Sequence, residues 1–128
     1  MPDGIVLIVD DDPIGRMSLE TLLKDERYKI LLAATGKEAL AHAQEFPPDL
    51  VILDILLPDL SGYDICKILR SNKATEKSYV VMITSMDSRK AHLEAMQAGA
   101  DLFINKPFNF SAMRSLVEKV ITKPDDNK

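Results

Sequence analysis

Five short apolar runs, each followed directly by polar residues, form the main pattern of this sequence. The runs cover residues 5–9, 28–34, 50–53, 79–83 and 102–105. Continuous apolar runs of this length, rich in Val, Ile and Leu, are typical of strands that are buried on both faces. The segments between them show the three- and four-residue apolar spacing of helices. This alternation predicts an α/β domain with a parallel sheet and helices on both faces.

Residues that begin and end helices occur where this alternation requires them. Asp12 followed by Pro13 is a favoured pair of N-cap and first helical residue, and Thr35 with Glu38 has the form of a capping box. Gly99 is placed to end a helix, and Asn109 to begin the last one. We therefore expect helices over residues 13–24, 62–70, 88–97 and 111–121, and from the capping box to residue 46.

Polar groups capable of chemistry follow several of the apolar runs. Asp10 and Asp11 follow the first run, Asp54 the third, Thr84 the fourth and Lys106 the last. Because the carboxyl ends of parallel strands lie along one edge of a sheet, we expect these side chains to meet there. The sequence therefore predicts a site of three carboxylates, one hydroxyl and one ammonium.

The residue types at this predicted site fit a divalent metal and a phosphoryl group. Mg²⁺, or Mn²⁺ in its place, takes oxygen ligands and uses one or two carboxylates with several waters. Asp10, Asp11 and Asp54 repel one another unless a cation lies between them. The ammonium of Lys106 and the hydroxyl of Thr84 are groups that bind phosphoryl oxygens. The set favours phosphoryl transfer to a carboxylate.

Length and composition set the class of protein. The chain has 128 residues, of which 46% are hydrophobic, so we expect one domain over residues 1–122 and a polar tail or linker stub over residues 123–128. A formal charge of -4 argues against a nucleic-acid surface. We find neither an apolar stretch long enough for a membrane span nor a start that resembles a signal peptide.

The cysteine and the histidines have simple interpretations. Cys66 has no second cysteine in the chain with which to form a disulfide, which is typical of a cytoplasmic protein. It lies in an expected helix, and we interpret it as a small, half-buried thiol. His42 and His92 have no Cys or His at metal-ligand spacing, and we expect both at surface positions of helices.

From Ile5 to Ile121 the chain resembles the receiver domain of bacterial two-component response regulators, and it is similar to the stand-alone chemotaxis type. The motifs that carry the resemblance are Val-Asp-Asp-Asp at 9–12, Leu-Asp-Ile-Leu-Leu-Pro-Asp-Leu-Ser-Gly at 53–62, Ile-Thr-Ser at 83–85, Gly-Ala-Asp at 99–101 and Asn-Lys-Pro-Phe at 105–108. The resemblance implies a flavodoxin-like, doubly wound (βα)5 fold with five parallel strands in the order 2-1-3-4-5.

The resemblance also assigns roles to the acidic residues. Asp54 would accept a phosphoryl group from a phosphohistidine. Asp10, Asp11 and Asp54 would hold the metal ion together with the main-chain carbonyl of Leu56. The module would assist its own phosphorylation and dephosphorylation and would otherwise not be an enzyme.

The resemblance implies roles for three further residues, of which Thr84 and Phe103 form the switch. Thr84 and Lys106 would each bind an oxygen of the phosphoryl group, and the bond between Lys106 and Pro107 is expected to be cis. As Thr84 moves toward the phosphoryl group, Phe103 would turn inward into the vacated space. Phe103 has no hydroxyl, so the switch would depend on packing.

The partners that the resemblance implies are proteins. The donor would be a sensor histidine kinase or a histidine phosphotransfer protein, and Ile14 and Met17 on the first helix would form part of its docking surface. The output would be a downstream protein target or an attached output domain. Leu56 and Met86 flank the predicted site, and we expect these apolar side chains to slow hydrolysis of the phosphorylated form.

Several other interpretations remain open at this point. The chain is either a stand-alone receiver or a module cut from a multidomain regulator or hybrid kinase. A Mg²⁺-dependent aspartyl phosphohydrolase is a minor alternative, disfavoured because Leu56 stands where such an enzyme places its general acid. A nucleotide or flavin binder is weaker, since the glycine motifs of those sites are missing. A receiver that is not phosphorylated is also disfavoured, because each chemical position holds a suitable residue.

Overall fold

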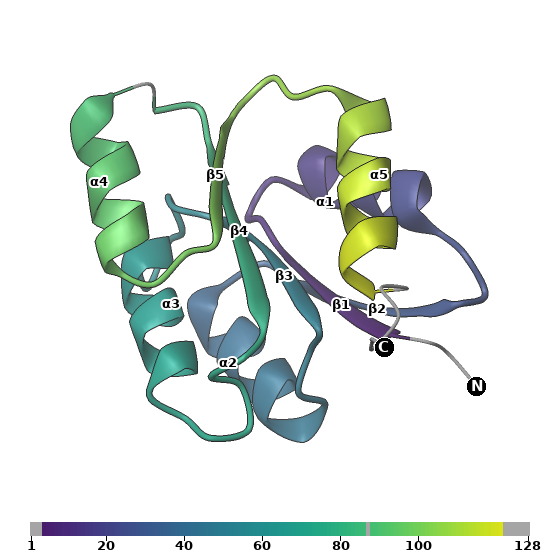
Figure 1. Ribbon diagram of the computed structural model, residues 1–128, viewed down its shortest axis with the longest axis horizontal. Coiled ribbons are helices and arrows are strands. Elements are labelled where there is room, and N and C mark those ends of the chain that lie inside the picture. Colours follow the sequence, from purple (N-terminus) through teal and green to yellow (C-terminus); the bar gives the residue numbers. More distant parts are fainter. Residues whose placement is uncertain (1–3, 87, 122–128) are drawn as a thin grey trace.

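The computed structural model describes residues 4–86 and 88–121 and contains a five-stranded parallel sheet (Figure 1). The strands are β1 (Gly4–Val9), β2 (Tyr28–Ala33), β3 (Leu50–Asp54), β4 (Tyr79–Thr84) and β5 (Leu102–Asn105). Their order in the sheet is β2-β1-β3-β4-β5. The predicted fold class and strand order are confirmed.

A helix follows each strand in the part of the chain that the structure describes. The helices are α1 (Pro13–Leu23), α2 (Gly36–Glu45), α3 (Gly62–Arg70), α4 (Arg89–Gln97) and α5 (Phe110–Ile121). Helices α2, α3 and α4 cover one face of the sheet, and α1 and α5 cover the other (Figure 1). This three-layer arrangement is the one predicted from the alternating pattern.

The inner strand β1, which has a neighbour on each side, explains why the apolar runs are continuous. Val6 and Ile8 pack in the core shared with α1 and α5, whereas Leu7 and Val9 pack in the core shared with α2, α3 and α4. All four side chains are 0% exposed. Burial of such a side chain stabilises the fold by about 1.5–3 kcal/mol, so both faces of this strand anchor the polar residues that follow it.

The predicted helix ends are close to those observed. The side chain of Asp12 accepts a hydrogen bond from the Ile14 N–H and caps α1. Thr35 caps α2, although Glu38 reaches back to the N–H of Ala34, one residue earlier than in a standard capping box. Gly99 has a φ of 105°, which a glycine adopts without strain, and it follows α4 as predicted.

Some helix boundaries differ from the prediction by one residue. Lys24 and Phe46 are C-caps rather than helical residues, and α5 begins at Phe110 rather than Ser111. Asn109 nevertheless acts in the predicted way, because its side chain accepts a hydrogen bond from the Ala112 N–H. At each helix end, the terminal residues use only one of their two backbone groups, N–H or C=O, in hydrogen bonds within the helix. This makes the exact ends hard to place from sequence.

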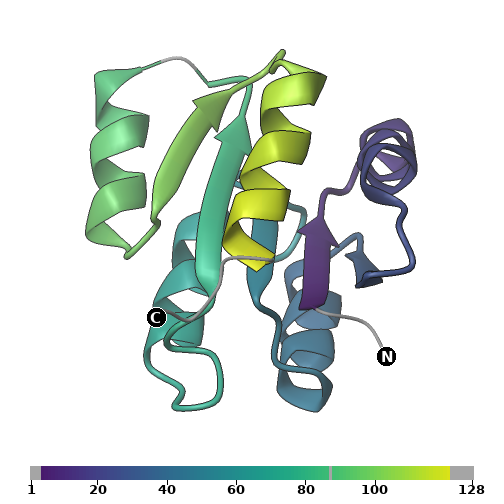
Figure 2. The same ribbon diagram turned by 45° about the vertical axis from the view of Figure 1, so that its right-hand side comes forward.

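The strands run in one direction, so their carboxyl ends share one edge of the sheet (Figure 2). β1 pairs with β3 in a register that sets Val9 beside Leu53, and the residues that follow them therefore emerge together. Within residues 4–86 and 88–121, no helix combines the length and apolarity needed to cross a membrane. The predicted tail over residues 123–128 lies outside the described residues.

Candidate functional site

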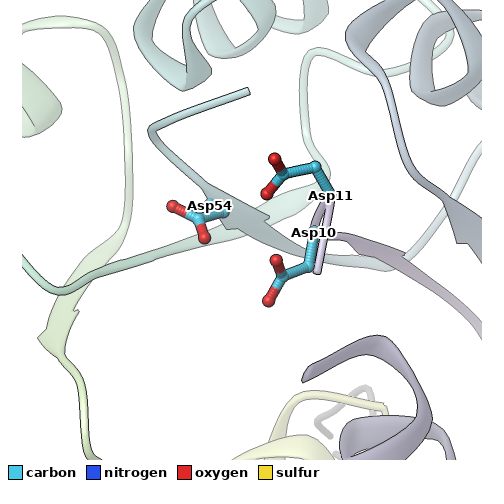
Figure 3. Close-up of side chains that lie close together, drawn as sticks. All are labelled: Asp10, Asp11 and Asp54. Carbon is cyan, nitrogen blue, oxygen red and sulfur yellow. The ribbon is translucent and has the colours of Figure 1, made fainter. Parts of the chain in front are cut away.

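Three aspartates meet at the carboxyl edge of the sheet. Asp10 and Asp11 follow β1, and Asp54 is the last residue of β3. Each offers one carboxylate oxygen, and these oxygens lie within 4.8 Å of one another. The three carboxylates turn to the same side of the strand ends (Figure 3). Asp10 is 1% and Asp54 7% exposed, whereas Asp11 is exposed to solvent.

Lys106 joins two of these carboxylates. Its Nζ lies 2.9 Å from Asp54 Oδ2 and 3.2 Å from Asp10 Oδ2. Burial alone lowers the pKa of Lys106, but the hydrogen bond and charge of Asp54, with those of Asp10, together raise that pKa above its ordinary value. The lysine is therefore a fixed positive charge at the site, and the predicted convergence of the acidic residues with Lys106 is confirmed.

The backbone holds the second oxygen of each buried carboxylate. Asp10 Oδ1 accepts a hydrogen bond from the Asp12 N–H at 2.9 Å, and Asp54 Oδ1 accepts one from the Leu56 N–H at 3.1 Å. Each carboxylate is thus oriented from two sides, by its own turn and by Lys106. Gly62 allows the turn after Asp54, because an added Cβ would lie 2.7 Å from the Asp54 carbonyl oxygen.

The donor set fits a divalent cation with oxygen ligands. Three carboxylates within one small space supply hard ligands, and no nitrogen or sulfur ligand belongs to the cluster found among the described residues. Mg²⁺ and Mn²⁺ prefer such oxygens and keep several waters. The exposure of Asp11 leaves room for those waters on the solvent side. The acidic cluster is therefore suited to hold one such ion.

Thr84 lies at the same edge but is bonded elsewhere. It is 0% exposed, and its Oγ1 accepts a hydrogen bond from the Met86 N–H at 3.2 Å. Its carbonyl accepts a bond from the Lys106 N–H at 2.9 Å, so β4 also positions the start of the lysine segment. Across residues 4–86 and 88–121, no hydrogen bond joins Thr84 to Asp54.

The end of β5 and the residues after it show one expected and one unexpected feature. The bond between Lys106 and Pro107 is cis, as the resemblance implies. Asn105, which the sequence analysis left without a role, donates from Nδ2 to the Met86 carbonyl at 2.7 Å. It thereby ties the end of β5 to the loop after Thr84. An asparagine directly before the lysine was the available signal for this contact.

Phe103 on β5 packs against helix α4. Its ring lies parallel to the ring of His92, with 4.9 Å between centroids and 7° between planes. Phe103 is half-buried, and His92 is exposed on the helix surface as expected. The contact between them was missed from sequence, because nothing local aligns a helix position with a strand eleven residues later. His42 is half-buried in the last turn of α2.

The predicted docking residues lie on the exposed side of α1. Ile14 is 74% and Met17 63% exposed. They line a groove of about 510 Å³ between α1 and α5, together with Phe110, which is 55% exposed, and Arg114. The α1 residues could be identified from the sequence. Those of α5 could not, because these two helices become neighbours only through the strand order of the sheet.

Cys66 is buried in the core beneath α3, more deeply than predicted. Burial raises the pKa of its thiol above the ordinary value, which favours the less nucleophilic protonated form. Its interpretation as a packing residue therefore holds.

Comparisons with known proteins give the same family from sequence and from structure. The family model of the response regulator receiver domain matches residues 6–118. The chain is 36% identical over 125 residues to response regulator MprA of Mycolicibacterium vanbaalenii, which covers 94% of this chain and 52% of MprA. It is 34% identical over 115 residues to response regulator PleD of Caulobacter vibrioides, which covers 87% of this chain and 25% of PleD.

A solved structure shares the fold along nearly its whole length. The chemotaxis protein CheY4 of Vibrio cholerae superposes with a TM-score of 0.83 and 31% identity, covering 91% of this chain and 97% of that one. The chain spans about half the length, or less, of the two curated relatives named above. With this family match, and with an acidic cluster and a lysine at one sheet edge, the chain belongs to the response regulator receiver domains, the phosphoacceptor modules of two-component systems.

Proposed function

We propose that Asp54 is the residue that accepts the phosphoryl group. The observation that carries this proposal is the contact of Lys106 Nζ with Asp54 Oδ2 inside the acidic cluster. Asp54 occupies the end of the central strand β3, and its second oxygen is fixed by the Leu56 N–H. One carboxylate oxygen is thus oriented toward the lysine at a site that opens to solvent beside Asp11.

With a phosphohistidine as donor, the transfer forms one bond to phosphorus and breaks another. An Asp54 carboxylate oxygen forms a bond to phosphorus while the phosphorus–nitrogen bond of the phosphohistidine breaks. The electron pair of that bond returns to the imidazole nitrogen. Lys106 then pairs with a phosphoryl oxygen, and Thr84 donates its hydroxyl hydrogen to another after leaving the Met86 N–H. These residues neutralise and orient the transferred group.

Asp10, Asp11 and Asp54, with the main-chain carbonyl of Leu56, would hold Mg²⁺ or Mn²⁺. When bound, the cation neutralises negative charge on the phosphoryl oxygens. Asp10 already has both oxygens engaged, by Lys106 and by the Asp12 N–H, whereas Asp11 is open to solvent. This difference favours direct coordination by Asp11 and contact through water by Asp10.

Phe103 is the residue proposed to transmit the change. Its half-buried ring stacks on the ring of His92 of α4. Movement of Thr84 toward the phosphoryl group would let this ring turn inward. That motion changes the surface of α4 and β5, which we propose as the surface read by a downstream protein or output domain.

The proposed donor is a sensor histidine kinase or a histidine phosphotransfer protein in the cytoplasm. The groove between α1 and α5 lies beside the residues that follow β1, and its exposed Ile14, Met17 and Phe110 offer an apolar contact surface. An amphipathic helix of the donor fits a groove of this kind.

The direct test is incubation with acetyl phosphate and Mg²⁺, followed by intact mass measurement. The wild-type protein should gain one phosphoryl group, and Asp54→Asn should gain none. Asp64→Asn is a matched control, because Asp64 is an exposed aspartate in the first turn of α3. Equal phosphorylation of wild type and Asp54→Asn would contradict the assignment. Steady release of phosphate from phosphomonoesters would instead support the minor alternative, a phosphohydrolase.

A further inference from the structure

A glycine in the first turn of α1 lies against the acidic cluster. Gly15 is the third residue of this helix, and its φ is not in the left-handed region, so the backbone alone does not call for glycine. Glycine is a poorer helix former than every residue except proline. Its presence here therefore calls for an explanation in the space around it.

That space is filled by a carboxylate. A Cβ added to Gly15 would lie 2.6 Å from Asp10 Oδ2 and 3.3 Å from Asp10 Cγ. Distances under 3.0 Å are essentially never seen for real Cβ atoms, so an alanine at this position forces something to shift. The contact is between the helix backbone and a proposed metal-binding residue.

The Asp10 carboxylate has little freedom to move away. It is 1% exposed, its Oδ1 is bonded to the Asp12 N–H, and its Oδ2 is paired with Lys106. A rotation that relieves the clash lengthens one of these two contacts. Such a rotation would therefore change the geometry of the site.

Helix α1 is also held in place. Arg16, the next residue, donates from its guanidinium to the Asp10 carbonyl at 2.7 Å. The Arg16 N–H bonds to the Asp12 carbonyl at 3.0 Å, and the Asp12 side chain caps the helix. The start of α1 and the turn after β1 thus form one hydrogen-bonded unit, which keeps Gly15 close to Asp10.

We propose that Gly15 is a positioning residue: the absence of a side chain there lets the Asp10 carboxylate take the orientation that pairs with Lys106 and faces the divalent cation. The part that concerns the cation rests on the proposed function. The part that concerns Asp10 and Lys106 does not, because it describes the protein without metal.

The first test is a double-mutant cycle of thermal unfolding in the presence of EDTA. Gly15→Ala should lower the Tm of the wild type, because the clash outweighs the gain in helix propensity. In an Asp10→Ala background the same change should raise the Tm, since the carboxylate is gone and only the gain remains. Equal shifts in both backgrounds would overturn the proposal. A single variant that fails to fold, beside a double variant that folds, supports it.

The second test is Mg²⁺ affinity by titration calorimetry. Gly15→Ala should bind Mg²⁺ about tenfold more weakly, as is typical when a residue that orients a metal ligand is changed. Gly36→Ala is the matched control, because its added Cβ would lie 2.9 Å from the Leu60 side chain rather than from a carboxylate. Unchanged Mg²⁺ affinity in Gly15→Ala would overturn the part that concerns the cation. Failure of Asp54 to accept a phosphoryl group would contradict the proposed function but leave the unfolding cycle unaffected.

Discussion

The ring of His92 on α4 lies parallel to that of Phe103 on β5, 4.9 Å away between centroids. The two residues belong to the elements whose surface we propose as the output. Phe103 is half-buried and also packs against the core that contains α2, α3 and α4. The stack therefore links the position of the proposed switch residue to a helix side chain that is exposed.

Removing the stack should favour the inward position of Phe103. Aromatic pairs contribute about 0.5–1.5 kcal/mol beyond burial, and an exposed partner lies at the lower end. His92→Ala should then raise the inward population, and with it the rate of phosphorylation by acetyl phosphate, by about two- to fivefold. The ring resonances of Phe103 report the population by NMR.

Two variants control for this effect. His92→Phe keeps an aromatic ring and should restore wild-type behaviour. Leu93→Ala changes the next residue of α4, which is 54% exposed, without touching the stack. A Leu93→Ala effect as large as that of His92→Ala would show that loss of helix surface, rather than loss of stacking, is the cause.

Lys106 should stabilise the protein most when no metal is bound. Lys106→Ala leaves the buried carboxylates of Asp10 and Asp54 without their cationic partner. We expect the free energy of unfolding in EDTA to fall by about 1.5–3 kcal/mol. The difference in this free energy between wild type and Lys106→Ala should be smaller with Mg²⁺, because the cation neutralises the carboxylates in place of the lysine. Urea unfolding with and without Mg²⁺ measures both. Lys77→Ala, an exposed lysine, should change neither value.

The pH dependence of this contribution has a definite sign. The pKa of Lys106 is raised in the folded protein above its ordinary value of 10.5. The folded state therefore holds the proton more tightly than the unfolded state. The stabilisation is fully present below pH 10.5 and is lost as the pH rises through the higher folded pKa. Lys106→Ala and wild type should thus converge in stability only above that pH.

Asp59 should stabilise the loop after Asp54 by capping α2. Its Oδ1 accepts a bond from the Gly36 N–H at 2.7 Å, and its Oδ2 accepts one from the Lys37 N–H at 3.0 Å. These bonds, the first from Gly36, hold the pKa of Asp59 below its ordinary 3.8. Asp59→Asn should lower stability at neutral pH.

The difference between Asp59→Asn and wild type should depend on pH. A lowered folded pKa gives stability that is present above pH 3.8 and is lost as the pH falls through the folded value. Thermal unfolding of both proteins from pH 7 down to pH 3 measures the difference. A Tm gap that stays constant over this range would contradict the capping role.

The apolar side chains beside the site should protect the phosphorylated form from water. Leu56 is 55% exposed, and Met86 is half-buried at the start of the loop after β4. Replacing both by asparagine removes this apolar cover and should shorten the half-life of phosphoryl-Asp54 by about tenfold. This is less than the roughly 10²–10⁴-fold effect of a positioned general base, because an amide can orient water but cannot take its proton. Intact mass against time measures the decay. Leu93→Asn serves as control, and an unchanged half-life in the double variant would refute the proposal.

The layers of the fold were predictable because the sequence signals are strong. The runs at 5–9 and 50–53 are apolar at every position, as strands covered on both faces require. Asp12 and Thr35 marked helix starts through a local mechanism, a side chain that accepts a backbone N–H. Convergence of Asp54 with Lys106 followed from parallel strand direction alone.

Other parts of the site depend on contacts between distant elements. His92 meets Phe103, and Asn105 meets Met86, only because α4 and β5 pack in one particular way. Gly15 looked like an unfavourable helix residue until the position of Asp10 was known. Such contacts depend on how side chains pack to within a few tenths of an ångström. The hydrophobic periodicity of the sequence does not encode packing at that precision.

A charge introduced on the α1 surface should slow phosphorylation by the partner protein without slowing phosphorylation by a small donor. Ile14 is 74% exposed beside Phe110 in the groove between α1 and α5, so Ile14→Glu should cost little stability. It should slow transfer from the donor kinase or phosphotransfer protein at least tenfold, because a charge in an apolar contact must be desolvated. Phosphorylation by acetyl phosphate, which needs no docking surface, should stay within about twofold of wild type. Leu93→Glu, on the opposite helical layer, is the matched control and should leave both rates unchanged. If Ile14→Glu slowed both reactions equally, the effect would lie in the site itself, and the groove would lose its assignment as the donor surface.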